Sequence, residues 1–165
     1  MNDARVQNLN GPEDPLTLVY TLTANRFAPA AGNPMLVRAR VLGVKGEDVL
    51  EGEKRKYPLE FEYASTQGDH YEIELPAGYT VDEVPAAQNA QIPGFSYHSE
   101  PKLDGDLLIY RRVYERKSAD FPVDELGKLK DFFRRISSDE RAMTILKRSA
   151  AEPKPAAQAS KRSPR

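Results

Sequence analysis

The stretch FSYHSEPKLDGDLLIYRRVYER, residues 95–116, decides the fold of this 165-residue chain. Two runs that alternate between apolar and polar residues flank the turn Asp104-Gly105-Asp106, and Asp-Gly between such runs is a strong signal for a β-hairpin. The first run extends from Tyr97 to Leu103 and the second from Leu107 to Arg116, continuing towards Lys117. We therefore expect two antiparallel strands joined by a tight turn.

Further runs with a period of two residues lie on the N-terminal side of this hairpin. They occupy residues 16–23, 36–42, 59–63 and 71–75. The first run places Leu16, Leu18, Tyr20 and Leu22 on one face, and the second directs Arg38 and Arg40 outward. Gly- and Pro-containing turns separate the runs at 31–34, 67–69, 76–78 and 93–94. The chain is therefore predicted to be mostly β, an antiparallel sandwich-like domain of about seven strands.

One amphipathic helix is predicted near the C-terminus. Its apolar residues recur at helical spacing after Pro122: Leu126, Leu129, Phe132, Phe133 and Ile136. Such a stripe usually packs on the protein's own sheet. Phe132 and Phe133 are adjacent and diverge by about 100° around the helix, so one of them is a candidate docking surface for a neighbouring domain.

The helix is expected to end soon after Ile136. Ser137-Ser138-Asp139-Glu140 resembles a capping box, which predicts a new short turn at this point. The run from Met143 to Leu146 then reads as a closing strand. Strands followed by one helix and another strand indicate an antiparallel α+β arrangement, not a parallel sheet.

Composition divides the chain into three parts. Residues 1–14 are rich in Asn, Asp, Gly and Pro and are expected to be a flexible connecting segment, whereas residues 15–148 form the folded domain. Residues 149–165 carry a net charge of +3 and contain no aromatic or β-branched residue, which is typical of a disordered basic Ala/Pro-rich tail. Residues 43–56 are charged and contain glycines, and are expected to be a mobile loop.

Several classes of function are excluded by composition. With 39% hydrophobic and 30% charged residues, and no apolar run near the roughly 18 residues that a spanning helix needs, no membrane span is expected. The opening segment shows no signal peptide. The chain contains no cysteine, which removes disulfides, zinc-thiolate sites and cysteine nucleophiles.

Acid–base catalysis has weak support. The two histidines, His70 and His98, have no other metal-ligating or catalytic residue at a motif spacing. Ser65 or Ser96 could be the nucleophile of a Ser–His–Asp triad, but neither serine lies in a nucleophile-elbow motif. We therefore expect no catalytic residue, no metal ligand and no cofactor.

Two sets of charged residues are expected to be solvent-exposed surface residues and not parts of a functional site. Paired carboxylates are needed for glycoside hydrolysis, but the alternating pattern directs all four candidates into water: Glu60, Glu62, Glu72 and Glu74. A basic group consists of Arg111, Arg112, Arg116 and Lys117. Arg111 and Arg112 point to opposite faces of a strand, which disperses the charge, and no nucleic-acid partner is expected.

Two stretches together resemble the C-terminal domain of bacterial transglutaminase-like proteins. The first contains Arg55-Lys56-Tyr57-Pro58-Leu59 and then YEIELPAGYTVDEVP, residues 71–85. The second contains GDLLIYR, residues 105–111, followed by Phe121-Pro122, Phe132-Phe133-Arg134-Arg135-Ile136 and Ile145-Leu146-Lys147. Such proteins join an N-terminal β-rich domain of unknown function to a papain-like core that precedes this module.

The resemblance implies a non-catalytic structural or interaction module. The chemistry of those proteins belongs to a Cys–His–Asp triad in the core, and nothing in this chain matches the core. A transglutaminase-like core, in cis or in trans, is the implied partner. The resemblance also implies a periplasmic or extracellular location if the chain belongs to an exported parent, and the cytoplasm if the chain is complete.

Two alternatives remain from the residues themselves. One is a free-standing module that binds glycans or peptides, which an exposed group of Tyr63, Tyr71, Tyr79 and Tyr97 would favour. The other, more remote, is a small hydrolase, which a concave pocket containing His70 or His98 would favour.

Overall fold

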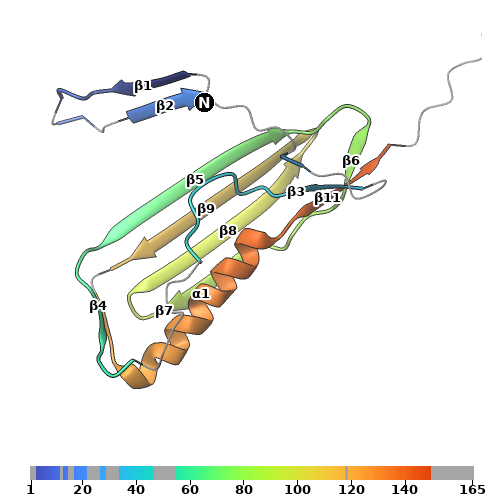
Figure 1. Ribbon diagram of the computed structural model, residues 1–165. Coiled ribbons are helices and arrows are strands. Elements are labelled where there is room, and N and C mark those ends of the chain that lie inside the picture. The colour runs from blue at the N-terminus through green and yellow to red at the C-terminus, as the bar shows by residue number, and fades with distance from the viewer. Residues whose placement is uncertain are drawn as a thin grey trace, which may run out of the picture.

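The computed structural model describes residues 3–11, 13–14, 17–21, 27–28, 34–46, 55–117 and 119–149. Within these residues the chain forms eleven strands in antiparallel sheets and one α-helix near the C-terminus (Figure 1). The prediction of a mostly β, antiparallel fold with one packed helix is confirmed. No helix in this described part is long and apolar enough to cross a membrane.

The main sheet has four strands in the order β5-β9-β8-β7. These are β5 (Ser65–Glu74), β9 (Leu107–Arg116), β8 (Phe95–Asp104) and β7 (Gln88–Ile92). The predicted hairpin forms its centre, because β8 and β9 pair over ten residues from Phe95↔Arg116 to Asp104↔Leu107. Gly105 in the connecting turn has a φ of 59°, a conformation that glycine adopts without strain.

The remaining strands form three smaller sheets. A three-stranded sheet has the order β3-β11-β6, and two strand pairs are β4-β10 and β1-β2. Their bounds are β3 (Met35–Val37), β11 (Thr144–Arg148), β6 (Tyr79–Glu83), β4 (Leu59–Phe61), β10 (Ala119–Phe121), β1 (Asp3–Gln7) and β2 (Thr17–Thr21). Several of these strands have only three residues, which explains why eleven are observed and about seven were predicted.

The helix α1 (Leu126–Arg141) follows a 3₁₀ turn, η1 (Val123–Glu125), that begins directly after Pro122. It does not end near Ile136, and the predicted capping box is wrong. The helical period continues from Ile136 to Asp139 and Glu140, and both side chains are buried on the same face as the apolar stripe. Buried side chains of the sheet donate hydrogen bonds to these two acidic residues, so the helix can continue.

Two clusters of buried side chains lie under one face of the main sheet. Phe95, Tyr97 and Tyr114 pack against α1, with Leu59, Phe61 and Phe121 at one end of this cluster. The second cluster joins Leu108 and Tyr110 of β9 to the three-stranded sheet. The helix and the small sheet therefore form a second layer together, and the main sheet is the first layer.

Some details at the N-terminal end differ from the predictions. The segment expected only to connect includes β1, whose backbone pairs with β2 from Asp3↔Thr21 to Gln7↔Thr17. Leu18 of β2, one member of the predicted apolar face of this strand, is 60% exposed. Arg38 and Arg40 are half-buried, because the chain around them runs beneath the main sheet.

Other predictions fall outside the described residues. These concern residues 150–165 of the tail, residues 47–54 of the expected loop, residues 31–33 of one turn, and Leu16, Leu22 and Thr23 of the first run. The start of the expected loop is described and is fixed against α1, since Lys45 N and Gly46 N both donate to the Glu140 carboxylate.

Gly46→Ala should destabilise the protein by roughly 1–3 kcal/mol, because the added methyl group would overpack a tight contact. A Cβ at Gly46 would lie 2.6 Å from Ser137 Cα in the helix backbone. The matched control is Gly127→Ala, which meets open space on α1 and should stabilise by up to about 1 kcal/mol. Urea unfolding of both variants measures the difference, and equal effects would contradict the contact.

Candidate functional site

The predicted docking residues Phe132 and Phe133 are both part of the core, so this prediction is wrong. Phe132 is 2% exposed and Phe133 is 6% exposed. Both rings contact Phe95 of the sheet, with centroids 5.7 and 5.9 Å from its ring. The strands β4 and β10 bring Phe61 and Phe121 beside the same Phe95 ring, so they belong to the same core cluster as the helix.

Neither histidine forms a hydrogen bond with the other or with a serine in the described part of the chain. His70 and His98 are exposed on β5 and β8, on the face of the main sheet that points away from α1. His70 Nε2 lies 3.3 Å from Glu72 Oε1, and His98 pairs in register with Val113. Ser96 Oγ donates to Glu115 and Ser65 lies exposed at the start of β5. The described residues thus contain no Ser–His–acid arrangement.

The four glutamates point outward, as the alternating pattern predicted. Glu60 and Glu62 belong to the β4 region, whereas Glu72 and Glu74 belong to the main sheet. The two pairs are therefore on different sheets. No group of three or more His, Asp or Glu side chains that could hold a metal ion occurs in the described part of the chain.

The basic group is dispersed, and one of its members is a core residue. Arg111 is exposed and Arg112 is buried, as the alternation of β9 requires. Arg116 Nε donates to the Tyr63 carbonyl, and its guanidinium lies 5.4 Å from the Phe61 ring centroid. These contacts make the group structural and leave no common basic surface.

The buried guanidinium of Arg112 organises a polar cluster between the sheet and the helix. Its Nε donates to Asp69 Oδ2 at 2.8 Å, and its Nη1 donates to Glu140 Oε1 at 2.6 Å. Its Nη2 also donates to the Gly43 carbonyl at 2.6 Å. Burial by itself would lower the pKa of Arg112, but the Asp69 hydrogen bond and the charges of Asp69 and Glu140 raise it above its usual value. The arginine is therefore charged.

A second polar group lies one residue away on α1. Asp139 Oδ2 accepts hydrogen bonds from Tyr97 at 2.5 Å and from Tyr110 at 3.0 Å, and the two tyrosine oxygens are 3.3 Å apart. Burial and the bond to Asp139 raise the pKa of Tyr97 far above its usual value. Burial also raises the pKa of Tyr110, to about 12. Both phenols are therefore neutral donors at ordinary pH.

A hollow of about 250 Å³ opens beside this group at the C-terminal end of α1. It is lined by Pro85, Ala86, Gln88, Arg135, Ser138, Asp139 and Ala142. A smaller hollow shares three of these residues, Pro85, Asp139 and Ala142, and adds Arg40 and Tyr110. Neither histidine lines these hollows.

The sequence carried one signal for these polar residues that local motifs obscured. Continuing the spacing of Leu129, Phe132 and Ile136 by one turn reaches Asp139 and Glu140, which places both acids on the buried face. The motif Ser-x-x-Glu is equally typical of a helix start, and it therefore favoured a new turn at Ser137 over a continuing helix. The hollow has no local signal, since it joins segments near residues 40, 85 and 139.

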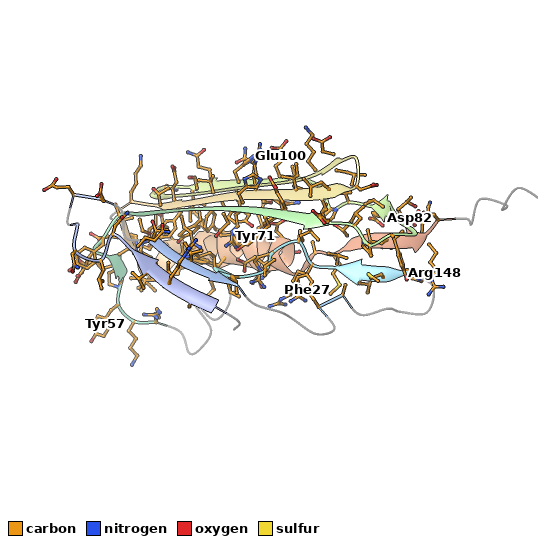
Figure 2. The ribbon with its side chains drawn as sticks, turned by 90° about the horizontal axis from the view of Figure 1, so that it is seen from above. Phe27, Tyr57, Tyr71, Asp82, Glu100 and Arg148 are labelled. Carbon is orange, nitrogen blue, oxygen red and sulfur yellow. The ribbon has the colours of Figure 1, made fainter. Side chains whose placement is uncertain are left out.

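The face of the main sheet opposite α1 is exposed in the described structure. Figure 2 shows Glu100 projecting from this side, away from the rest of the molecule. We call it the open face; its side chains come from His70, Glu72, His98, Glu100, Lys102, Arg111, Val113 and Glu115. This face carries groups of both charges, and Arg111 pairs in register with His70 on one side and with Glu100 on the other.

The four tyrosines considered for glycan binding do not share one surface. Tyr97 is buried, and Tyr71 and Tyr79 are half-buried against the second core cluster. Tyr63 alone among them is strongly exposed, at 72%. This arrangement offers no platform on which a sugar could stack over several rings.

Comparison with known proteins agrees with a mostly β domain of undefined role. Residues 33–146 match the family described as a Domain of Unknown Function with solved-structure structure, DUF3858. This match covers more than half of the chain, and the chain belongs to this family. No curated protein matches the sequence.

One solved structure is similar in fold. It is the crystal structure of a "putative protease" from Parabacteroides distasonis, with a TM-score of 0.56 and 11% sequence identity. The match covers 72% of this chain but 24% of that chain. At this identity the likeness concerns the fold alone, and this chain corresponds to about a quarter of the longer protein.

Glu140→Gln should lower the free energy of unfolding by about 3 kcal/mol, because it removes a charge from a buried ion pair and leaves Arg112 partly uncompensated. The control is Asp82→Asn, which breaks the exposed Lys147–Asp82 pair and should cost less than about 1 kcal/mol. Denaturant unfolding at pH 7 compares the two. A loss in Glu140→Gln no larger than that of the control would contradict the role of the cluster.

Stability should fall as pH rises from about 10 to 12 through Tyr110. The pKa of this phenol is 10 in the unfolded chain and about 12 in the folded one, so its contribution is complete below pH 10 and is lost through pH 12. Tyr110→Phe removes the titration, and its difference from the wild type should shrink over that range. Urea unfolding at several pH values measures this. A difference that stays constant would show that Tyr110 does not titrate as described.

Proposed function

We propose that the chain is a non-catalytic interaction domain that packs beside a transglutaminase-like core, in cis or in trans. The observation that carries this proposal is the structural match, in which 72% of this chain corresponds to 24% of the Parabacteroides protein. A domain of this fold therefore occurs as one part of a longer chain. The likeness of residues 55–85 and 105–147 to the module after a transglutaminase-like core supplies the identity of the neighbour.

The use of the titratable side chains supports a non-catalytic role. In the described residues, those that are buried are occupied by structural bonds: Arg112 with Asp69 and Glu140, and Asp139 with two tyrosines. Among the exposed ones, His70 lies beside Glu72, but neither His70 nor His98 forms a hydrogen bond with a serine in the described residues. The geometry thus favours a module that binds over one that reacts.

The open face is the surface that best fits a neighbouring domain. Interfaces between domains of one chain are more polar than permanent subunit interfaces, and the open face is polar with both signs of charge. Val113 lies at its middle with 41% of its surface exposed, between Gly68 and His98 in register. Because Gly68 has no side chain, it leaves Val113 uncovered on that side.

Cross-linking mass spectrometry on the native protein in its source cells tests the proposal with two lysines of this chain. Lys102 lies on the open face, whereas Lys130 lies exposed on α1, on the other side of the molecule. We expect cross-links from Lys102, but not from Lys130, to a transglutaminase-like core. The double variant Arg111→Glu/Val113→Glu should abolish them without changing the circular dichroism spectrum.

Two results would overturn the proposal. One is the absence of cross-links between the domain and any core while the core itself is detected. The other is peptidase activity of the purified chain that His70→Ala or His98→Ala removes, since this would establish a catalytic role.

A further inference from the structure

The hollow at the end of α1 combines three features of a small-molecule site. It is concave, it has apolar walls formed by Pro85, Ala86 and Ala142, and its other lining residues are polar or charged: Gln88, Arg135, Ser138 and Asp139. At about 250 Å³ it is somewhat smaller than pockets for drug-sized ligands, which begin near 300 Å³. It therefore fits a group of only a few heavy atoms. Its lining residues come from the end of α1 and from the segment that leads into β7.

Asp139 supplies a buried acceptor to this hollow. The residue is 9% exposed, and Oδ2 is held by the hydroxyl groups of Tyr97 and Tyr110. Among the residues that the structure describes, none donates a hydrogen bond to Oδ1. The Oδ1 atom is not among the side-chain atoms that are both buried and without a partner in the described part of the chain, so it is accessible to a ligand that brings an N–H group.

One guanidinium group lines this hollow, and a second lines the adjoining one. Arg135 lies one helical turn before Asp139, and forms no ion pair with any described residue. Arg40 borders the adjoining hollow, and its buried Nε has no hydrogen-bond partner within the described ranges. Side chains four residues apart on a helix have Cβ atoms about 5–6 Å apart, which sets the separation between the acid and Arg135.

We propose that this hollow binds an α-amino acid group, in which a nitrogen donor and a carboxylate are attached to one carbon atom. The nitrogen donates to Asp139 Oδ1, and the carboxylate is held by Arg135, with Arg40 adding positive potential. The apolar walls accept a small side chain. Two sources carry this chemistry, a free amino acid and the C-terminal residue of a peptide, and the hollow itself is equally suited to both.

Three probes distinguish the sources, used on the full 165-residue chain. L-alanine carries both charges, N-acetyl-L-alanine keeps an N–H and the carboxylate as a peptide C-terminus does, and L-alaninamide lacks the carboxylate. Chemical-shift changes in ¹⁵N–¹H NMR spectra report binding at Ser138 and Gln88. We expect saturable binding of alanine or N-acetylalanine, with a Kd on the order of 1 mM for so few atoms.

The relative affinities of the three probes either identify the ligand or overturn the proposal. Binding of alanine alone identifies a free amino acid as the ligand, and binding of N-acetylalanine identifies a peptide C-terminus. Alaninamide should bind at least about tenfold more weakly than the tighter of the two. No binding of either carboxylate probe at roughly 20 mM, or equal binding of alaninamide, overturns the proposal.

Arg135→Gln tests the assignment of the carboxylate without disturbing the core, because Arg135 is exposed. It should weaken binding about tenfold and leave the unfolding midpoint unchanged. Arg134→Gln is the matched control, since Arg134 is an exposed neighbour that pairs with Asp131 away from the hollow. Equal affinities of the two variants would overturn the role of Arg135. Asp139→Asn should weaken the binding of alanine, because the acceptor loses its negative charge, and its fold is checked by the chemical shifts of β7 and β8.

Discussion

A guanidinium in the interior of a small domain must be neutralised, and the arrangement around Arg112 follows from this requirement. The side chain enters the space between sheet and helix because β9 alternates strictly and its neighbours Tyr110 and Tyr114 point the same way. An unpaired charge there would cost several kcal/mol. Asp69 from the adjacent strand, Glu140 from α1 and the Gly43 carbonyl share its N–H groups, so one residue fixes three segments. Glu140 in turn holds the amides of Lys45 and Gly46.

The same constraint explains why the last turn of α1 is rich in buried polar groups. Asp139 and Glu140 are consecutive, and each accepts hydrogen bonds from the sheet, the first from tyrosines and the second from arginine. The helix end is therefore positioned by directional bonds as well as by Phe132, Phe133 and Leu129. A helix end fixed in this way gives the hollow beside Asp139 a defined shape, which a binding site needs.

Local patterns in the sequence predicted the elements well and their long-range partners poorly. The Asp104-Gly105 turn and the period of two correctly predicted the central hairpin and the opposite directions of Arg111 and Arg112. By contrast, Asp69 and Glu140 are 43 and 28 residues away from Arg112, and nothing in their local context links them. The burial of both Phe132 and Phe133 likewise depends on a distant segment, because both rings pack against Phe95 of β8. The hollow joins segments that no single motif contains.

Native-state hydrogen exchange of the Lys45 and Gly46 amides tests the central role of this cluster most directly. Both amides lie in a segment without regular secondary structure, and each donates to the buried Glu140 carboxylate. If Arg112 and Glu140 fix this segment, the two amides should be protected nearly as strongly as the amides in the middle of α1. Exchange at the rate of an open loop, while α1 remains protected, would contradict this account.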